Sequence, residues 1–572
     1  NTAVGNQSLE NVTTGDNNIG VGHRTLCTLT TGSCNVAVGK DALKTNTGDS
    51  NVAMGQEALV ANTTANNNTA VGTLALTTNT TGTSNVAVGN NALKTQTTAD
   101  GNTALGSDTL CTITSGAGGN TAVGQKALED DTTGFYNTSV GSLSLCQNTE
   151  GSCNVAIGRE ALRNNTTGAN NTAVGSFSLR DNSSGANNTA IGLCVMLSNT
   201  TGCYNHALGR NTLMDNTTGC YSTAIGQQAL QNSSATGDTG NTAVGALALY
   251  ENTSGTNNTA VGRLALSCNT TAAGNVAVGY NALVANTEGG CNTAVGCNAG
   301  GTMTTATNNV AMGRASMGNT TTGSENTALG ALSLQTNSEG ANNVAVGFCA
   351  LKSNTTADNN TAIGYGSLKV NTTGCQNTGL GRTALQDNTT GCRNVSLGFD
   401  SLANNTTGEC NTGVGFDAGS TITTGSNLTV LGSGAQPSSA TATNEITLGN
   451  SSVTSLRCAD TSISSLSDLR DKKNVEDIPH GLDFINALRP VKFDWNARDG
   501  SRIGKKDYGF IAQELDKVEE TFGNREYTRL VHKDNPDKWE ADPMKTYPIL
   551  IKAIQELSET NKDLKSRIEA LE

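Results

Sequence analysis

Small apolar and polar positions alternate in one recurring phrase through the first 449 residues of the chain. The phrase begins as Asn1-Thr-Ala-Val-Gly5, and its glycine recurs 27 times up to Gly449. Of the 26 intervals between these glycines, 23 measure 17 residues, and the other three measure 16, 18 and 19. A period kept this closely predicts one structural unit stacked many times, with the rare length changes absorbed in loops.

The repeated unit reads Asn-Thr-Ala-Val-Gly-x-x-Ala-Leu-x-x-Asn-Thr-Thr-Gly-x-x, and residues 154–170 follow it closely. We number its positions 1 to 17 from the first asparagine, so that the recurring glycine stands at position 5. Seventeen residues are too few for two helices and a turn, and Asn-Thr-Thr-Gly is typical of a turn. The phrase therefore predicts two short strands per unit and, over residues 1–449, a mostly β, solenoid or β-roll shaft.

Alternation within Thr-Ala-Val predicts which side chains share a face. Positions 2 and 4, which are Thr or Val and then Val, Ile, Leu or Met, lie on the same side of a strand. We expect this to be the core side. The alanines at positions 3 and 8 are expected to be small so that another backbone can approach.

Position 1 is asparagine in 24 of the 27 units, the exceptions being Ser222, Leu428 and Glu445. Asparagines in register along a stack of strands predict a ladder in which each amide bonds to the next. The alternative is that asparagine only tolerates the backbone angles of a corner. We expect both effects to act together.

Composition divides the chain in two. Of its 83 charged residues, 41 lie in the last 112 positions, and the part before them is a polymer of Gly, Asn, Thr and Ala. The net charge of -13 argues against a nucleic-acid partner, which needs clustered Lys and Arg. No run of about 18 apolar residues is present, so membrane insertion is not expected.

The 16 cysteines include no Cys-x-x-Cys, and no phosphate loop or metal motif occurs, so neither a metal nor a cofactor is predicted. Two pairs of cysteines stand one period apart, hence about one strand spacing: Cys203 with Cys220, and Cys375 with Cys392. That spacing falls inside the range for a disulfide. Reduced thiols are the equal alternative.

Glycosylation sequons recur in the turn of the repeat, as at Asn62, Asn79 and Asn165, each reading Asn-Thr-Thr. The same letters are what the turn of the repeat requires. Glycosylation is therefore left open by the sequence.

After Gly449 the period dissolves, and we expect a connector over residues 450–466 and a small α+β domain over 467–572. Its pattern predicts a helix over 482–488, strands over 491–495 and 508–511, a helix from about 512 and a long helix from near Pro548. The long helix has a heptad seam, which favours association but leaves dimer or trimer open. The seam is Leu550, Ile554, Leu557, Asn561, Leu564, Ile568 and Leu571.

Four motifs in this region carry a family resemblance: Ser467-Asp-Leu-Arg-Asp-Lys472, Leu488-Arg-Pro-Val-Lys-Phe493, Tyr508-Gly-Phe-Ile-Ala-Gln-Glu514 and Tyr547-Pro-Ile-Leu-Ile-Lys-Ala-Ile554. They resemble the intramolecular chaperone domain at the C-terminus of phage endosialidases and viral tail fibres. One departure is Val475, where the family usually has Ile. The repeats are in turn similar to the shorter head repeats of trimeric autotransporter adhesins.

The resemblance implies trimerisation, assistance to the folding of the fibre and self-cleavage of the bond between Leu466 and Ser467. Ser467 would be the nucleophile and Lys472 its base, a pairing that is coherent because a lysine whose pKa is lowered by burial can take the serine proton. The alternative from the residues alone is a helix-capping Ser467 and a solvated Lys472.

These observations predict a structural and adhesive fibre shaft on the surface of a virus or phage particle. Its expected partners are two further copies of itself, in a homotrimer, and a host-surface glycan or protein. A cell-surface trimeric adhesin is the first alternative, and a glycan-degrading tailspike, which needs paired carboxylates, is the second. The only enzymatic activity expected is a single-turnover Ser-Lys autoproteolysis.

A long stack of nearly identical units has many slipped registers of similar energy. A self-associating domain at one end would set the register once, which gives the predicted chaperone a physical purpose.

Overall fold

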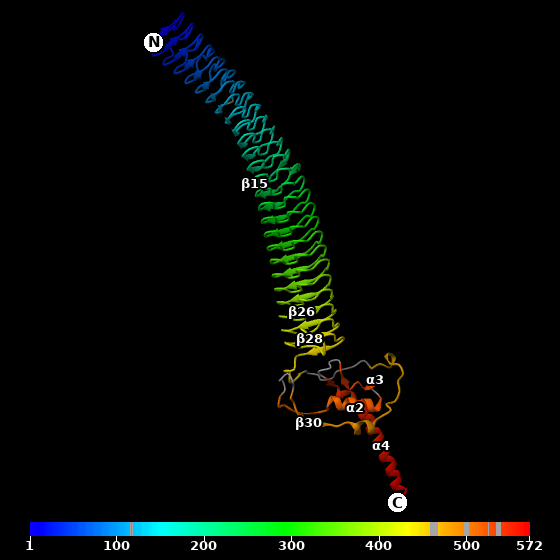
Figure 1. The fold of residues 1–572 in the computed structure, drawn as a ribbon. Helices are drawn as coiled ribbons and strands as arrows, with labels where there is room; N and C mark the ends of the chain where they lie inside the picture. The colour runs from blue at the N-terminus through cyan, green and yellow to red at the C-terminus, as the bar shows by residue number, and fades with distance from the viewer. Residues whose placement is uncertain (115, 117, 458–466, 497–502, 524, 534–538) are drawn as a thin grey trace. The chain divides into compact units, whose positions relative to one another are not determined.

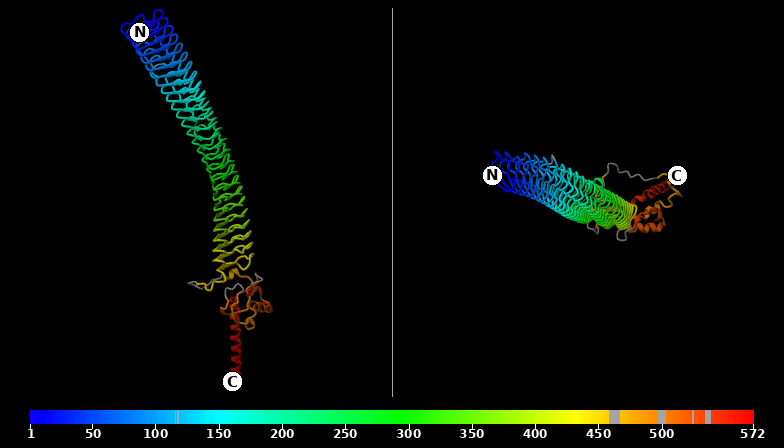
Figure 2. Two further views of the ribbon diagram at one scale, coloured as in Figure 1. Left: turned by 60° about the vertical axis from the view of Figure 1, so that its left-hand side comes forward. Right: turned by 90° about the horizontal axis from the view of Figure 1, so that it is seen from above.

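The computed structural model describes residues 1–114, 116, 118–457, 467–496, 503–523, 525–533 and 539–572. The chain divides into two compact units, Asn1–Asp358 and Asn359–Glu572. The first consists of stacked coils, and the second holds further coils together with the C-terminal helices and strands (Figures 1 and 2).

Each coil contributes one three-residue strand, at positions 2 to 4 of the repeat, to a 27-stranded parallel sheet. Neighbouring coils pair in register, so that Thr172 lies opposite Thr189 and Val174 opposite Ile191. The fold is thus a parallel β-solenoid with the predicted period. In the first unit the strands are β1 (Thr2–Val4), β2 (Ile19–Val21), β3 (Val36–Val38), β4 (Val52–Met54), β5 (Thr69–Val71), β6 (Val86–Val88), β7 (Thr103–Leu105), β8 (Thr121–Val123), β9 (Thr138–Val140), β10 (Val155–Ile157), β11 (Thr172–Val174), β12 (Thr189–Ile191), β13 (His206–Leu208), β15 (Thr223–Ile225), β17 (Thr242–Val244), β18 (Thr259–Val261), β19 (Val276–Val278), β20 (Thr293–Val295), β21 (Val310–Met312), β22 (Thr327–Leu329) and β23 (Val344–Val346).

The coils of the second unit repeat the arrangement, and Figure 1 labels two of their strands, which lie one above the other. Its solenoid strands are β24 (Thr361–Ile363), β25 (Thr378–Leu380), β26 (Val395–Leu397), β27 (Thr412–Val414), β28 (Thr429–Leu431) and β29 (Ile446–Leu448). The expected boundary at 449 follows the last of these strands, and the division into shaft, connector and chaperone domain stays a prediction.

The prediction of a second strand in every coil is wrong. Positions 7 and 9 have positive φ, as at Glu160 (55°) and Leu162 (51°), so the backbone alternates in hand through this segment. Left-handed residues on either side of position 8 make tight turns, whereas a strand needs extended angles throughout. Among the described coils a second pairing is limited to β14 (Gly219–Cys220) with β16 (Gly237–Asp238) and to an isolated bridge between Ser426 and Thr443.

The predicted core side of the strand is also wrong. In β10, Ala156 is fully buried, whereas Ile157 is 40% exposed and Val155 is half-buried. The interior is filled instead by the alanines of positions 3 and 8 and the leucine of position 9, as in Ala161 and Leu162. The reason is the narrowness of the coil: in one of the coils with glycine at position 3, an added Cβ at Gly20 would lie 2.5 Å from Ser8 Oγ.

The recurring glycine at position 5 is required by both conformation and space. Gly89, for example, has φ of +141°, and a Cβ there would lie 2.1 Å from the carbonyl oxygen of Gly106 in the next coil. A side chain cannot fit between carbonyl groups stacked this closely. This explains why the glycine marks the period so strictly.

The asparagine ladder predicted at position 1 is present, with a different bonding pattern. Asn171 is fully buried, its Oδ1 accepts a hydrogen bond from the backbone N–H of Asn188 at 3.0 Å, and its Nδ2 donates to the Gly185 carbonyl at 2.8 Å. The amides thus tie mainly to the backbone of the next coil. They satisfy buried polar groups that a coil of this width leaves without a strand partner.

A second asparagine ladder, at position 12, was not predicted. Asn165 Nδ2 donates to Asn148 Oδ1 at 2.7 Å and to the carbonyl of Gly168 at 2.9 Å. Position 12 is also the first residue of the sequons, and Asn62, Asn79 and Asn165 are each fully buried. The nitrogen that would carry a glycan therefore points into the folded coil.

The C-terminal segment packs around Phe484, Leu515, Leu530, Val531 and Ile549. The predicted elements are present, except that the second strand begins and ends two residues earlier than expected. The elements are α1 (Leu482–Ala487), β30 (Val491–Asp494), β31 (Lys506–Gly509), α2 (Ala512–Phe522), α3 (Arg525–Thr528), β32 (Val531–His532), β33 (Glu540–Ala541), the 3-10 helix η2 (Pro543–Thr546) and α4 (Tyr547–Glu569).

Candidate self-processing site and self-association surfaces

The Ser467 to Lys472 motif forms a single tight turn. Its centre is the 3-10 helix η1 (Leu469–Asp471), which Asp468 caps by accepting a hydrogen bond from the backbone N–H of Arg470 at 2.9 Å. An ion pair between the side chains of Asp468 and Arg470 holds the same turn. Hydrogen bonding to Arg470 keeps the pKa of the Asp468 carboxyl below its usual value.

The turn brings the two predicted catalytic side chains together. Lys472 Nζ donates a hydrogen bond to Ser467 Oγ at 2.6 Å, which is within the reach required of a nucleophile and its base. Both residues are exposed in the single chain. A lysine amine can accept the serine proton only where burial keeps the amine neutral. The exposed pair in the single chain does not have this burial. Leu466, the other side of the predicted bond, lies outside the described residues.

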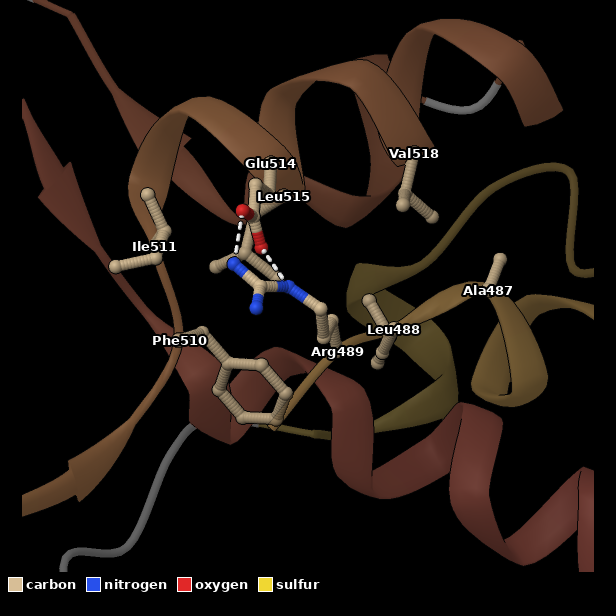
Figure 3. Close-up of a pocket in the computed structure, with 8 residues that line it drawn as sticks. All are labelled: Ala487, Leu488, Arg489, Phe510, Ile511, Glu514, Leu515 and Val518. Atoms are coloured by element: carbon tan, nitrogen blue, oxygen red, sulfur yellow. Dashed lines mark hydrogen bonds and ion pairs between the residues drawn. The ribbon is translucent and has the colours of Figure 1, made fainter. Parts of the chain in front are cut away.

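An ion pair joins two of the four motifs. The Arg489 guanidinium donates to both carboxylate oxygens of Glu514, between the start of β30 and helix α2 (Figure 3). This bonding raises the pKa of Arg489 and lowers the pKa of Glu514, so both groups remain charged. The pair was missed in the sequence because its members stand 25 residues apart, with nothing local to connect them.

Beside this ion pair lies a cavity of about 230 Å³. Figure 3 shows that apolar side chains from the end of α1 and the start of α2 line most of it. The lining provides no serine, cysteine or histidine, so the cavity holds no nucleophile of its own. It is lined by Ala487, Leu488, Arg489, Phe510, Ile511, Glu514, Leu515 and Val518.

Helix α4 has one face buried in the C-terminal segment and another face exposed. Ile549 and Ala553 are buried in the C-terminal segment, against which α1 also packs. The predicted heptad seam faces away from this core. Its apolar members are 40 to 88% exposed: Leu550, Ile554, Leu557, Leu564, Ile568 and Leu571.

The outward face of the solenoid sheet forms a second uncharged surface, which we call the sheet stripe. It consists of positions 2 and 4 of the described strands, where the side chains are Thr, Val, Ile, Leu or Met, with His206 as the exception. Many of these apolar side chains are more than a third exposed, such as Met54, Leu105, Leu208 and Leu397. Exposed apolar side chains repeated at one position of successive strands are typical of an interaction face.

Among the described residues, no group of three or more His, Cys, Asp or Glu side chains is placed to hold a metal ion. No described helix combines the length and apolarity needed to cross a bilayer.

Comparison with protein-family models gives one match, to the chaperone of endosialidase, over residues 467–524. This span begins at Ser467 and ends just after α2, so it contains the tight turn and the Arg489–Glu514 ion pair. Neither the curated proteins nor the solved structures gave a match. The chain therefore joins a 17-residue-repeat parallel β-solenoid to a C-terminal segment that matches the chaperone of endosialidase, an arrangement that fits a tail-fibre-like protein.

Proposed function

We propose that the chain is the shaft of a virus or phage fibre whose C-terminal domain assembles three copies, sets their register and then cuts itself off before Ser467. The observation that carries this proposal is the hydrogen bond from Lys472 to Ser467 inside the segment that matches the chaperone family. The shaft serves adhesion, with a glycan or protein of the host surface as its receptor.

Two surfaces support the assembly step. The seam leaves five apolar side chains of α4 exposed at coiled-coil spacing, with Leu571 just after the helix, and burying them requires other helices of the same kind. The sheet stripe is a second surface through which copies can associate along the shaft, because it carries no charge that would make them repel. Another copy of the chain is the partner that matches it in both length and 17-residue period.

The cleavage step follows from the tight turn. Ser467 Oγ attacks the carbonyl carbon of Leu466, and its proton passes to a neutral Lys472 Nζ and from there to the departing amide nitrogen of Ser467. Water then hydrolyses the ester that links the two parts. Neighbouring copies would cover the exposed dyad and supply the desolvation that a neutral lysine requires, so cleavage is expected only after assembly.

Denaturing gels of the expressed full chain test the dyad. We expect a fragment comprising residues 467–572 from the parent chain and none from Ser467→Ala or Lys472→Ala. Lys473→Ala, which changes the adjacent exposed lysine, is the control and should be cut as the parent is. Equal cutting in all four proteins would refute the assigned dyad.

A second experiment separates assembly from cleavage. Ile554→Asp places a charge in the α4 seam, whereas Ser566→Asp places the same charge on an exposed position of the helix outside it. Light scattering should show a trimer for Ser566→Asp and smaller species for Ile554→Asp, and only the former should be cut. Trimer formation by both variants would remove the seam from the proposal.

A further inference from the structure

The solenoid contains two pairs of cysteines whose sulfur atoms are already in contact along the stack. Cys203 and Cys220 approach to 2.8 Å between their Sγ atoms, and Cys375 and Cys392 to 3.0 Å. In each pair the two residues stand 17 positions apart, hence at the same position of adjacent coils. All four are present as thiols in this structure.

The contact results from the geometry of the coil at position 16. At this position the side chain of one coil commonly accepts a hydrogen bond from the backbone N–H of the coil before, as Ser33 does from Asp16 and Ser324 from Thr307. In the same way, the backbone N–H of Cys203 donates to Cys220 Sγ at 3.0 Å. This bond turns the second sulfur over the first residue, so two cysteines in succession are forced to meet.

The second pair repeats this arrangement in the other compact unit, with the backbone N–H of Cys375 donating to Cys392 Sγ at 3.0 Å. Two occurrences in different surroundings show that the register of the coils, and not a local irregularity, brings the sulfurs together. Closing each contact to the ~2.05 Å of a disulfide requires the sulfurs to move by only about 1 Å.

We infer that Cys203–Cys220 and Cys375–Cys392 are sites of disulfide formation, each a covalent clasp between two adjacent coils of one chain. The oxidant is a low-molecular-weight disulfide. A thiolate of the pair attacks one of its sulfurs and releases one small thiol, and the second cysteine then attacks the mixed disulfide and releases the other. Two protein thiols lose two electrons, and one small disulfide is reduced to two thiols.

Both disulfides would link coils that have fewer of the usual hydrogen bonds or core contacts between coils. The asparagine ladders lose members just after the first pair, where Ser222 stands at position 1 and Ser233 at position 12. Ser222 Oγ bonds instead to Thr239 Oγ1 at 2.6 Å, so the amide chain stops there. The second pair spans β25, whose inward residue is Gly379 in place of the usual alanine. A covalent link at these places restrains coils in which a ladder asparagine or the inward alanine is replaced.

The two pairs should differ in rate because their surroundings differ in charge. Burial, the hydrogen bond to Cys220 and the charge of Asp238 raise the pKa of Cys203 to about 11. The pKa of Cys375 is also raised, chiefly by its hydrogen bond to Cys392, but Arg393 opposes this effect. Since the thiolate is the attacking species, Cys375–Cys392 should oxidise first.

The test is equilibration of the reduced full chain in a buffer of glutathione disulfide and glutathione, followed by blocking of free thiols and peptide mass spectrometry. We expect both clasps at an excess of at least tenfold over any other pairing, and Cys375–Cys392 to appear earlier. Two of the cysteines at position 17, Cys34 and Cys291, have no cysteine one period away and should form only mixed disulfides. A urea-unfolded sample, in which coil register is lost, should show no such preference.

Two outcomes would overturn the inference: both pairs remain fully reactive toward the blocking reagent, or their linked peptides are no commoner than random pairings. A second measurement uses the Cys203→Ser and Cys375→Ser variants, since serine keeps a small polar side chain at position 16. Oxidation should slow hydrogen exchange near β15 and β25 in the parent chain. It should leave exchange near the substituted pair unchanged in each variant, and an equal slowing there would count against the clasp.

Discussion

Asp131 occupies the place of an asparagine in the ladder at position 12, and its replacement by asparagine tests how that ladder works. The residue is fully buried, and its Oδ1 accepts hydrogen bonds from Asn148 Nδ2 at 2.9 Å and from the backbone N–H of Gly134 at 3.1 Å. Its Oδ2 is buried without a hydrogen-bond partner. The neighbour on the other side of the ladder is Ile113, which offers no donor.

Burial of this carboxyl raises its pKa from 3.8 to about 7, although the bonds from Asn148 and Gly134 work in the opposite direction. Since the folded-state pKa lies above the unfolded-state value, this group contributes its full stability below about pH 4. The contribution declines as the pH rises and is lost above pH 7. At ~1.4 kcal/mol for each pH unit between the two pKa values, ionisation opposes folding of this coil by up to ~4 kcal/mol at pH 8.

Asp131→Asn removes the charge and supplies an Nδ2 donor where the carboxylate has an unpartnered oxygen. In comparable coils, such as that of Asn165, this nitrogen donates to the backbone carbonyl three residues on. We therefore expect the variant to be more stable than the parent by ~1 to 4 kcal/mol at pH 8, with little difference at pH 4.

The assay is native-state hydrogen exchange of residues 120–150 at pH 5 and pH 8, corrected for intrinsic exchange, in parent and variant. The parent should open more readily at pH 8 than at pH 5, and Asp131→Asn should remove that difference. Asp49→Asn is the control, because Asp49 is exposed and accepts a hydrogen bond from the Ser33 backbone that asparagine can also accept. The reasoning fails if the parent shows no pH difference, or if the variant is less stable at pH 8.

Three shorter predictions concern other features. Gly279→Ala should destabilise its coil by more than ~3 kcal/mol, as measured by hydrogen exchange, because φ is +133° and the added Cβ would lie 2.6 Å from a carbonyl oxygen. Gly237→Ala is the control, because Gly237 has φ of +73° and open space around it, and it should cost only about 1 kcal/mol of stability. Expression through a secretory pathway should yield no glycan at Asn165 of the folded chain, which intact-mass measurement would show. Asn165→Ala should lower the stability of its coil by ~1 to 3 kcal/mol, because Asn148 Oδ1 loses its hydrogen-bond donor. Phe484→Ala should lower the free energy of unfolding of the C-terminal domain by ~3 to 5 kcal/mol in urea titration, and an unchanged midpoint would contradict its place in the core.

The period of the shaft could be read from the sequence because the glycine at position 5 has no substitute. Its positive φ and the carbonyl oxygen facing it exclude any side chain, so every coil repeats the same letter. The C-terminal elements could be predicted for a related reason. Helices α1, α2 and α4 have local apolar patterns that agree with their final packing.

The inward face of the coil could not be predicted from alternation alone. Alternation with a period of two residues identifies the side chains that share a face of the strand. It does not identify which face is buried. In an ordinary sheet the larger apolar residues would be buried, as expected for Val155 and Ile157. Here the opposite wall is close, and the small Ala156 is buried beside Ala161 while Val155 and Ile157 face outward. The width of the coil, which is a tertiary property, decides the outcome.

The asparagine ladder at position 12 was not predicted because a turn already explained the asparagine at that position. Asn165 stands in Asn-Thr-Thr-Gly, where turn chemistry already accounts for an asparagine. The signal that could have revealed the ladder is its recurrence in register with the other amides, since a turn alone accepts Asp, Ser or Gly at the same place. The contact between Ser467 and Lys472 could be predicted because both residues lie within one turn, whereas Arg489 and Glu514 stand 25 residues apart.

The two ladders also bear on how the shaft ages. Asparagine deamidates when the backbone nitrogen of the following residue attacks its side-chain carbonyl, a reaction that needs a mobile backbone. At Asn171 the following nitrogen, that of Thr172, donates to the carbonyl of Asn188 at 2.8 Å, and the side chain is held by the next coil. A chain this rich in asparagine is therefore chemically durable only while it is coiled, and an unfolded copy would decay far sooner.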